Sequence, residues 1–186
     1  PYLQKSGSTI IAIDAPAHGQ SSGKEFNVPR YAAFINKAVK KFEPHLIIGH
    51  SIGGSACLYH QYLHPGTSIQ KMVILGAPSD LKTLLDNYIQ MLSLNPKMSI
   101  HLEKHYLKNF DMELDNFSVA TLAKQIKVEG IIAHDINDTV VAFEEGQKIA
   151  ANWGKSRFIT THNLGHSMHD DNLYKEIYDF LFGEKK

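Results

Sequence analysis

Short apolar runs that suit β-strands alternate with longer stretches that suit helices along most of the chain. The runs are rich in β-branched residues and occupy residues 8–14, 45–51, 70–79, 128–135 and 156–166. Between them, and at the end of the chain, apolar residues recur at helical intervals. Strands that connect through helices form parallel sheets, because parallel neighbours need a crossover connection. The sequence therefore predicts an α/β fold, a mostly parallel sheet with helices on both faces.

Residues 79–127 interrupt this alternation. They are polar and helical in pattern and contain no convincing strand. We expect them to form a helical cap insertion between the third and fourth runs. Their aromatic and methionine side chains suit either an acyl pocket or the core of the insertion. A chain of 186 residues falls within the size of one domain, so we expect residues 1–186 to form a single domain that carries this insertion.

The overall charge excludes several classes of partner. The chain has 19 Lys and Arg residues against 19 Asp and Glu residues, and this balance favours neither nucleic acid nor an anionic membrane as a partner. No apolar run approaches the roughly 18 residues of a membrane span. The single cysteine, Cys57, lies within a helical pattern and is expected to be a buried, inert thiol. We expect a cytoplasmic protein, whose oligomeric state the sequence leaves open.

The motif GHSIGG, residues 49–54, places Ser51 between glycines. An apolar strand-like run precedes it and a helical pattern follows it. A serine at a sharp strand-to-helix turn adopts a strained backbone, and side chains two residues to either side would clash. This context predicts that Ser51 is a nucleophile and that the amide of Ile52 stabilises an oxyanion. The alternative is a tight turn that simply requires small residues.

A nucleophilic serine needs a base and an acid, which open α/β sheets carry at the carboxyl ends of their strands. Asp135 and Asp138 follow the fourth run, and the fifth run is followed by three histidines, His162, His166 and His169. We assign Asp138 and His166, because the order Ser51, Asp138, His166 is the one expected of an α/β hydrolase. Asp135 is the alternative acid, and the two other histidines are the alternative bases.

Three stretches together resemble the α/β-hydrolase superfamily, particularly esterases, lipases and peptidase-like members with a small helical cap. They are DAPAHGQSSG at residues 14–23, GHSIGG, and HDINDTVV at residues 134–141 followed by the GH at residues 165–166. The resemblance implies a serine hydrolase with Ser51, His166 and Asp138 as its triad and the Ile52 amide as an oxyanion donor. It implies a small-molecule ester or acyl substrate and neither cofactor nor metal. Two positions depart from the family pattern, where Asp135 replaces a glycine and Ala142 replaces a proline.

In that family three strands precede the DAPAHG-like stretch, whereas here only PYLQKSG precedes the first run. We therefore expect the first strands of the fold, and a second oxyanion amide that follows one of them, to be missing from this chain.

Other readings of the same residues lead to different classes of protein. A ligand-binding or scaffold protein would retain the fold without efficient turnover, and an acyltransferase or perhydrolase would use the same triad. A metal site made of His162, His166, His169 and Asp170 is disfavoured, because their spacing lacks the single-face geometry of H-E-x-x-H. Asp14 and His18 suit a structural turn. His50 is expected to pack behind the serine.

Overall fold

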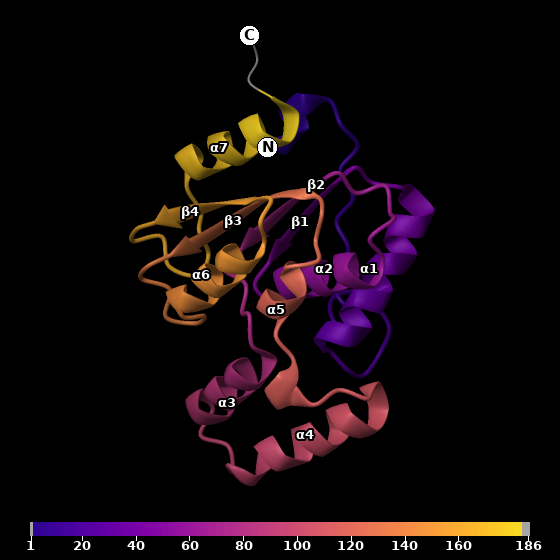
Figure 1. Ribbon diagram of the computed structural model, residues 1–186, viewed down its shortest axis with the longest axis vertical. Helices are drawn as coiled ribbons and strands as arrows, with labels where there is room; N and C mark the ends of the chain where they lie inside the picture. Colours follow the sequence, from indigo (N-terminus) through magenta and orange to yellow (C-terminus); the bar gives the residue numbers. More distant parts are fainter. Residues whose placement is uncertain (1, 184–186) are drawn as a thin grey trace.

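The computed structural model describes residues 2–183, and its centre is a parallel sheet of four strands (Figure 1). The strands are β1 (Leu46–His50), β2 (Lys71–Leu75), β3 (Glu129–Asp135) and β4 (Ser156–Thr161), paired in the order β1-β2-β3-β4. One row of paired residues, Gly49, Ile74, Ile132 and Phe158, crosses all four strands. The predicted α/β fold with a parallel sheet is confirmed.

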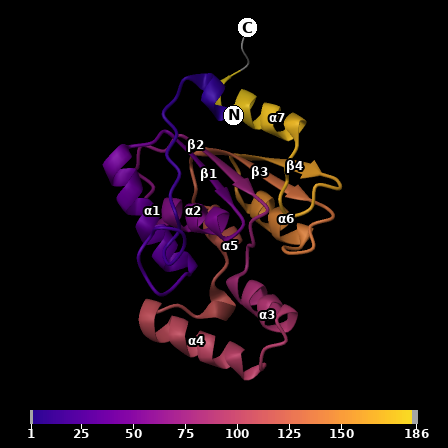
Figure 2. The ribbon, with the colours of Figure 1, turned by 180° about the vertical axis from the view of Figure 1, so that it is seen from behind.

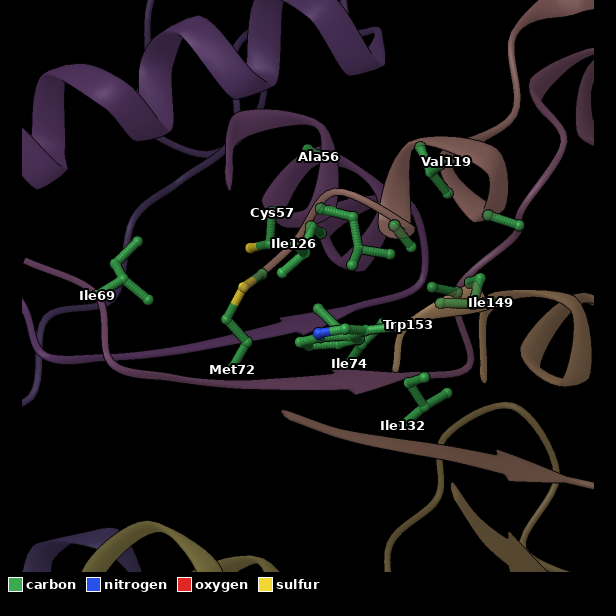
Figure 3. Packing of buried hydrophobic residues seen from close by; sticks show 14 of the residues in the cluster. Ala56, Cys57, Ile69, Met72, Ile74, Val119, Ile126, Ile132, Ile149 and Trp153 are labelled. Carbon is green, nitrogen blue, oxygen red and sulfur yellow. The ribbon is translucent and has the colours of Figure 1, made fainter. Parts of the chain in front are cut away.

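Helices cover both faces of the sheet because side chains alternate along each strand (Figures 1 and 2). Helices α1 (Val28–Phe42), α2 (Ile52–Leu63), α5 (Val119–Ala123) and α6 (Phe143–Asn152) lie on one face, and α7 (Asp171–Phe182) lies on the other together with the short helix η1 (Leu3–Ser6). On β2, Met72 and Ile74 pack with Trp153 in the first cluster (Figure 3), whereas Val73 packs against α7. Strands buried on both faces are continuous apolar runs, as the sequence shows.

The covering helices begin at residues that satisfy their first amides. The Asn27 side chain accepts a hydrogen bond from the Arg30 amide at the start of α1, and Asp170 accepts one from the Leu173 amide at the start of α7. Buried residues of α1 recur at helical spacing, at Val28, Ala32, Ile35 and Val39. The apolar stripe is the pattern from which the sequence predicted α1, and the two capping side chains determine where α1 and α7 begin.

The run at residues 8–14 is not a strand, contrary to the prediction. It pairs with none of the four described strands, and Ile10 and Ile11 are about half exposed. Only Ile13 packs against the first cluster. A β-branched composition produces a strand only where a neighbouring strand supplies the ladder of hydrogen bonds, and no described strand lies beside this run.

The segment between β2 and β3 contains α3 (Leu81–Met91), α4 (Lys97–Phe110), the short helix η2 (Leu114–Asn116) and α5. Helices α3 and α4 extend beyond the carboxyl ends of the strands, whereas α5 packs in the first cluster (Figure 1). A second apolar cluster joins Leu84 of α3 and Tyr106 of α4 to Val28 of α1. Among the described residues, no helix is both long and apolar enough to cross a bilayer.

Glu145 of α6 ties the start of this projecting segment to the main body, and the end of the segment is paired with its start. One carboxylate oxygen accepts hydrogen bonds from the Ser79 amide, the Ser79 hydroxyl and the Asp80 amide at 2.7–3.0 Å, and the other accepts one from Lys148 at 2.7 Å. Asp80 also pairs with Ser118 in an isolated antiparallel bridge. Burial alone would raise the pKa of Glu145, but its hydrogen bonds from Lys148, Ser79 and Asp80 outweigh burial and lower it. Glu145 therefore remains a carboxylate that fixes where the segment leaves the sheet.

Candidate active site

Ser51 occupies the sharp turn between β1 and α2. Its φ of 55° and ψ of −132° lie outside the regions that side-chain-bearing residues normally adopt. The turn is held by a hydrogen bond of 2.8 Å from the Ser51 amide to the Leu75 carbonyl at the end of β2. A strained backbone conformation persists only where surrounding contacts hold it, and here the hydrogen bond to β2 holds the Ser51 backbone.

Glycine is required at position 49 by the close approach of the returning helix. A Cβ atom at Gly49 would lie 2.7 Å from the Gly53 carbonyl oxygen and 2.7 Å from the Gly54 Cα, both rigid backbone atoms. The Ile52 amide is in the first turn of α2, where amides have no acceptor within the helix. The turn therefore places the serine at the amino end of α2, next to the Ile52 amide.

His166 links the serine to an acid in one hydrogen-bonded chain. Its Nε2 lies 3.1 Å from Ser51 Oγ, and its Nδ1 lies 2.7 Å from Asp138 Oδ2. A carboxylate only accepts hydrogen bonds, so Nδ1 carries the proton and Nε2 is free to accept one from the serine hydroxyl. The structure thus brings together the three residues that the sequence assigned to one site, from segments 115 and 28 residues apart.

Asp138 is held by its own loop. Its Oδ1 accepts hydrogen bonds from the amides of Val140 and Val141 at 2.8 and 2.9 Å, and its side chain is completely buried. His134 of β3 lies next to it, with Nε2 3.0 Å from the Val141 carbonyl and 3.4 Å from Asp138 Oδ2. Protein contacts rather than solvent therefore hold the Asp138 carboxylate so that its Oδ2 faces the imidazole of His166.

Asp135, the alternative acid, does not contact a histidine and instead holds the histidine loop in place. Its carboxylate accepts hydrogen bonds from the Asn137 amide, the Leu164 amide and the Thr161 hydroxyl at 2.8–3.0 Å, and the residue is fully buried. Burial alone would raise the pKa of Asp135, but the Leu164 and Asn137 amides and the Thr161 hydroxyl outweigh it and lower the pKa. The sequence marked this residue as the alternative acid and as a departure from a family glycine, but it did not indicate that the carboxylate holds the histidine loop.

We expect Asp135→Asn to lower the free energy of unfolding by about 2–3 kcal/mol at pH 7, because an amide offers one acceptor oxygen where the carboxylate offers two. The lowered pKa means that the carboxylate stabilises the fold above its unfolded pKa of about 3.9 and loses this effect as pH falls through the lower folded value. The difference between variant and wild type should therefore shrink below about pH 4. Urea unfolding over a pH series measures it.

The matched control is Glu129→Gln, an exposed carboxylate at the start of the same strand. It should change the unfolding free energy by less than about 0.5 kcal/mol at every pH. Equal stability of Asp135→Asn and the wild type at pH 7 would contradict the role of this carboxylate.

His50 does not simply pack behind the serine. Its Nε2 donates a hydrogen bond of 2.7 Å to the His166 carbonyl, and the two imidazole rings lie 4.8 Å apart between centroids. The side chain thus ties the histidine loop to the end of β1. No periodicity or motif in the sequence indicates this contact, because residues 50 and 166 meet only when β1 and the loop after β4 are folded.

The remaining candidates lie outside this constellation. His162 and His169 are exposed, and His169 Nδ1 contacts the Tyr174 hydroxyl. Asp14 accepts a hydrogen bond from the Gln20 amide at 2.9 Å, and His18 Nδ1 donates one to the Pro16 carbonyl, so both stabilise a loop. Cys57 is buried, as expected, and burial raises the pKa of its thiol to about 12. Among residues 2–183 no group of three or more His, Cys, Asp or Glu side chains is arranged to hold a metal.

One cavity of the structure lies away from the serine. It has a volume of about 470 Å³ and lies between α1 and the loop before it, lined by Lys24, Arg30, Phe34 and Lys37 among others. None of Ser51, Asp138 and His166 lines it.

Comparison with known proteins gives a family match and several structural neighbours. The family model described as the alpha/beta hydrolase fold matches residues 1–127. A hydrolase from Pseudomonas aeruginosa shares 17% identity with a TM-score of 0.67, over 90% of this chain and 77% of that one. An esterase from Exiguobacterium antarcticum shares 18% with a TM-score of 0.66, over 90% and 78%. A meta-cleavage product hydrolase from Pseudomonas fluorescens shares 14% with a TM-score of 0.60, over 89% and 75%. No curated protein sequence is significantly similar to the chain.

Proposed function

Because the chain belongs to the α/β-hydrolase family, we propose that it is a serine hydrolase that cleaves carboxylic esters through an acyl-enzyme. The observation that carries the proposal is the chain of hydrogen bonds from Ser51 through His166 to Asp138, at 3.1 and 2.7 Å. This is the arrangement of nucleophile, base and orienting acid that activates a serine hydroxyl.

In the acylation step, Ser51 Oγ attacks the ester carbonyl carbon while His166 Nε2 takes the hydroxyl proton. Asp138 holds the protonated imidazole and stabilises its charge. The negative charge that develops on the carbonyl oxygen is stabilised by the Ile52 amide at the amino end of α2. The tetrahedral intermediate then expels the alcohol, which leaves with the proton from His166.

Deacylation repeats these steps with water. His166 Nε2 removes a proton from the water, whose oxygen attacks the acyl carbon, and the proton returns to Ser51 as the acid is released. No step in this sequence requires a metal or an organic cofactor. An acceptor alcohol or peroxide in place of water would make the same site an acyltransferase or perhydrolase.

Labelling with a fluorophosphonate probe tests the proposal against a scaffold protein that only retains the fold. The probe reacts with an activated serine, and we expect stoichiometric labelling that peptide mass mapping assigns to Ser51. His166→Ala removes the base and should slow labelling by at least about 100-fold, since general base catalysis contributes 10²–10⁴-fold. An unlabelled wild-type protein with a cooperative thermal transition would refute a hydrolytic role.

A further inference from the structure

Helix α4 carries two unlike faces. Tyr106 is buried in the second apolar cluster, with Leu102 and Phe110 packed beside it. The opposite face presents Lys97, Lys104 and Lys108 together with Ile100 and Leu107, which recur at intervals of three and four residues. Ile100 and Leu107 are each 50% exposed. We call these five residues the outward face of α4.

The turn before α4 also exposes apolar side chains. Met91 and Leu92 at the end of α3 are 62% and 59% exposed, and Leu94 is 43% exposed. Several large apolar side chains exposed on neighbouring residues are typical of an interaction site. The projecting segment is the part of the molecule farthest from α7, with α4 at its tip (Figures 1 and 2).

The charge of this surface is uneven although the chain as a whole is neutral. None of Lys97, Lys104 and Lys108 forms an ion pair with a described residue. The acid within α4, Glu103, is engaged 2.8 Å from Lys82 of α3 and so does not neutralise the outward face. Asp111 is the C-cap residue of the helix, and Glu113 and Asp115 follow it in the chain. The surface therefore combines apolar side chains with a net positive charge.

We propose that the outward face of α4 and the adjoining turn dock onto an anionic lipid surface. Apolar side chains of such a helix enter the region between headgroups and acyl chains, while lysine ammonium groups remain among anionic headgroups with their alkyl stems buried. A second copy of the chain fits less well, because two equivalent faces would place lysine against lysine and lysine is depleted from protein interfaces. Docking does not depend on the proposed hydrolysis and extends beyond it.

Flotation of the full chain with vesicles tests the proposal. Vesicles of phosphatidylcholine and phosphatidylglycerol at 7:3 should bind the protein, and vesicles of phosphatidylcholine alone should bind at least about tenfold less, since each lysine near an anionic surface strengthens binding about fivefold. Binding to the anionic vesicles should weaken as NaCl is raised. The variant Lys97→Glu/Lys104→Glu/Lys108→Glu should lose at least tenfold in affinity, as should Ile100→Asp/Leu107→Asp.

The matched control is Lys40→Glu/Lys124→Glu/Lys127→Glu, which makes the same change in net charge with exposed lysines. Lys40 precedes β1 and Lys127 precedes β3, so they lie toward the amino ends of the strands, whereas α3 and α4 extend beyond the carboxyl ends. This control should bind at least tenfold more tightly than the α4 variant, and both should keep the wild-type thermal transition. Equal loss in the two variants, or no binding to anionic vesicles, would overturn the proposal. The proposal would also be overturned if the protein did not bind vesicles but formed a concentration-dependent dimer that Ile100→Asp/Leu107→Asp abolishes.

Discussion

Ser51→Ala is expected to lower kcat for hydrolysis of p-nitrophenyl acetate by about 10⁶-fold, because the nucleophile of a serine triad supplies most of the covalent route. Residual turnover would come from binding and the helix-terminal amide alone. The fold should be retained, since alanine keeps the Cβ atom and, among the described residues, the hydroxyl forms a hydrogen bond only with His166. Initial rates over a range of substrate concentrations measure the change.

Ser93→Ala is the matched control for this variant. Ser93 also has a positive φ, 51°, and lies in the exposed turn between α3 and α4. Its replacement removes a hydroxyl from another position of positive φ without touching the triad, so kcat should stay within about twofold of wild type. Undiminished hydrolysis by Ser51→Ala would show that this serine is not the nucleophile.

Asp138→Asn is expected to lower kcat by about 10⁴-fold through the tautomer of His166. The asparagine oxygen can still accept the hydrogen bonds of the Val140 and Val141 amides, so the loop should keep its shape. Its NH₂ group would then face His166 Nδ1 and donate to it, which places the imidazole proton on Nε2. A protonated Nε2 cannot accept the proton of Ser51.

The readout for Asp138→Asn combines kinetics with the rate of fluorophosphonate labelling, and both should fall together because both need an activated serine. Asp171→Asn removes an exposed carboxylate at the start of α7 and should leave both rates within about twofold. A wild-type labelling rate in Asp138→Asn would assign the orienting role to another group.

Individual residues show which parts of the fold local sequence can predict. Met72, Val73 and Ile74 are all apolar, and this continuity predicts a strand covered on both faces without knowledge of its neighbours. Ile10 and Ile11 have the same composition and yet form no strand, because strand formation also needs a hydrogen-bonded neighbour that local composition does not encode. Local pattern therefore predicted β1 to β4 and failed at residues 8–14.

Some features of the candidate site can likewise be predicted from local sequence, and others cannot. Gly49 and Ser51 are recognisable as a turn because the close approach of the Gly53 and Gly54 backbone to Gly49 arises within six consecutive residues. A Cβ atom at Gly53 would make only ordinary contacts with the Tyr31 ring. The choice between Asp135 and Asp138 depends on the path of a loop after β3, and in the structure Asp138 contacts His166 while Asp135 holds the loop at Leu164. That Ser51, Asp138 and His166 act as a triad remains a prediction for the kinetic experiments.

The sequence by itself determined the alternation of strands and helices, the strained turn at Ser51 and the short list of acids and bases, since each depends on neighbours within a few residues. Only the tertiary structure decided which acid contacts which histidine, that His50 binds the His166 carbonyl and that Glu145 fixes the projecting helices. These contacts join residues 28, 116 and 66 positions apart. They exist only because the parallel sheet brings the carboxyl ends of its strands to one edge, where residues far apart in the sequence come into contact.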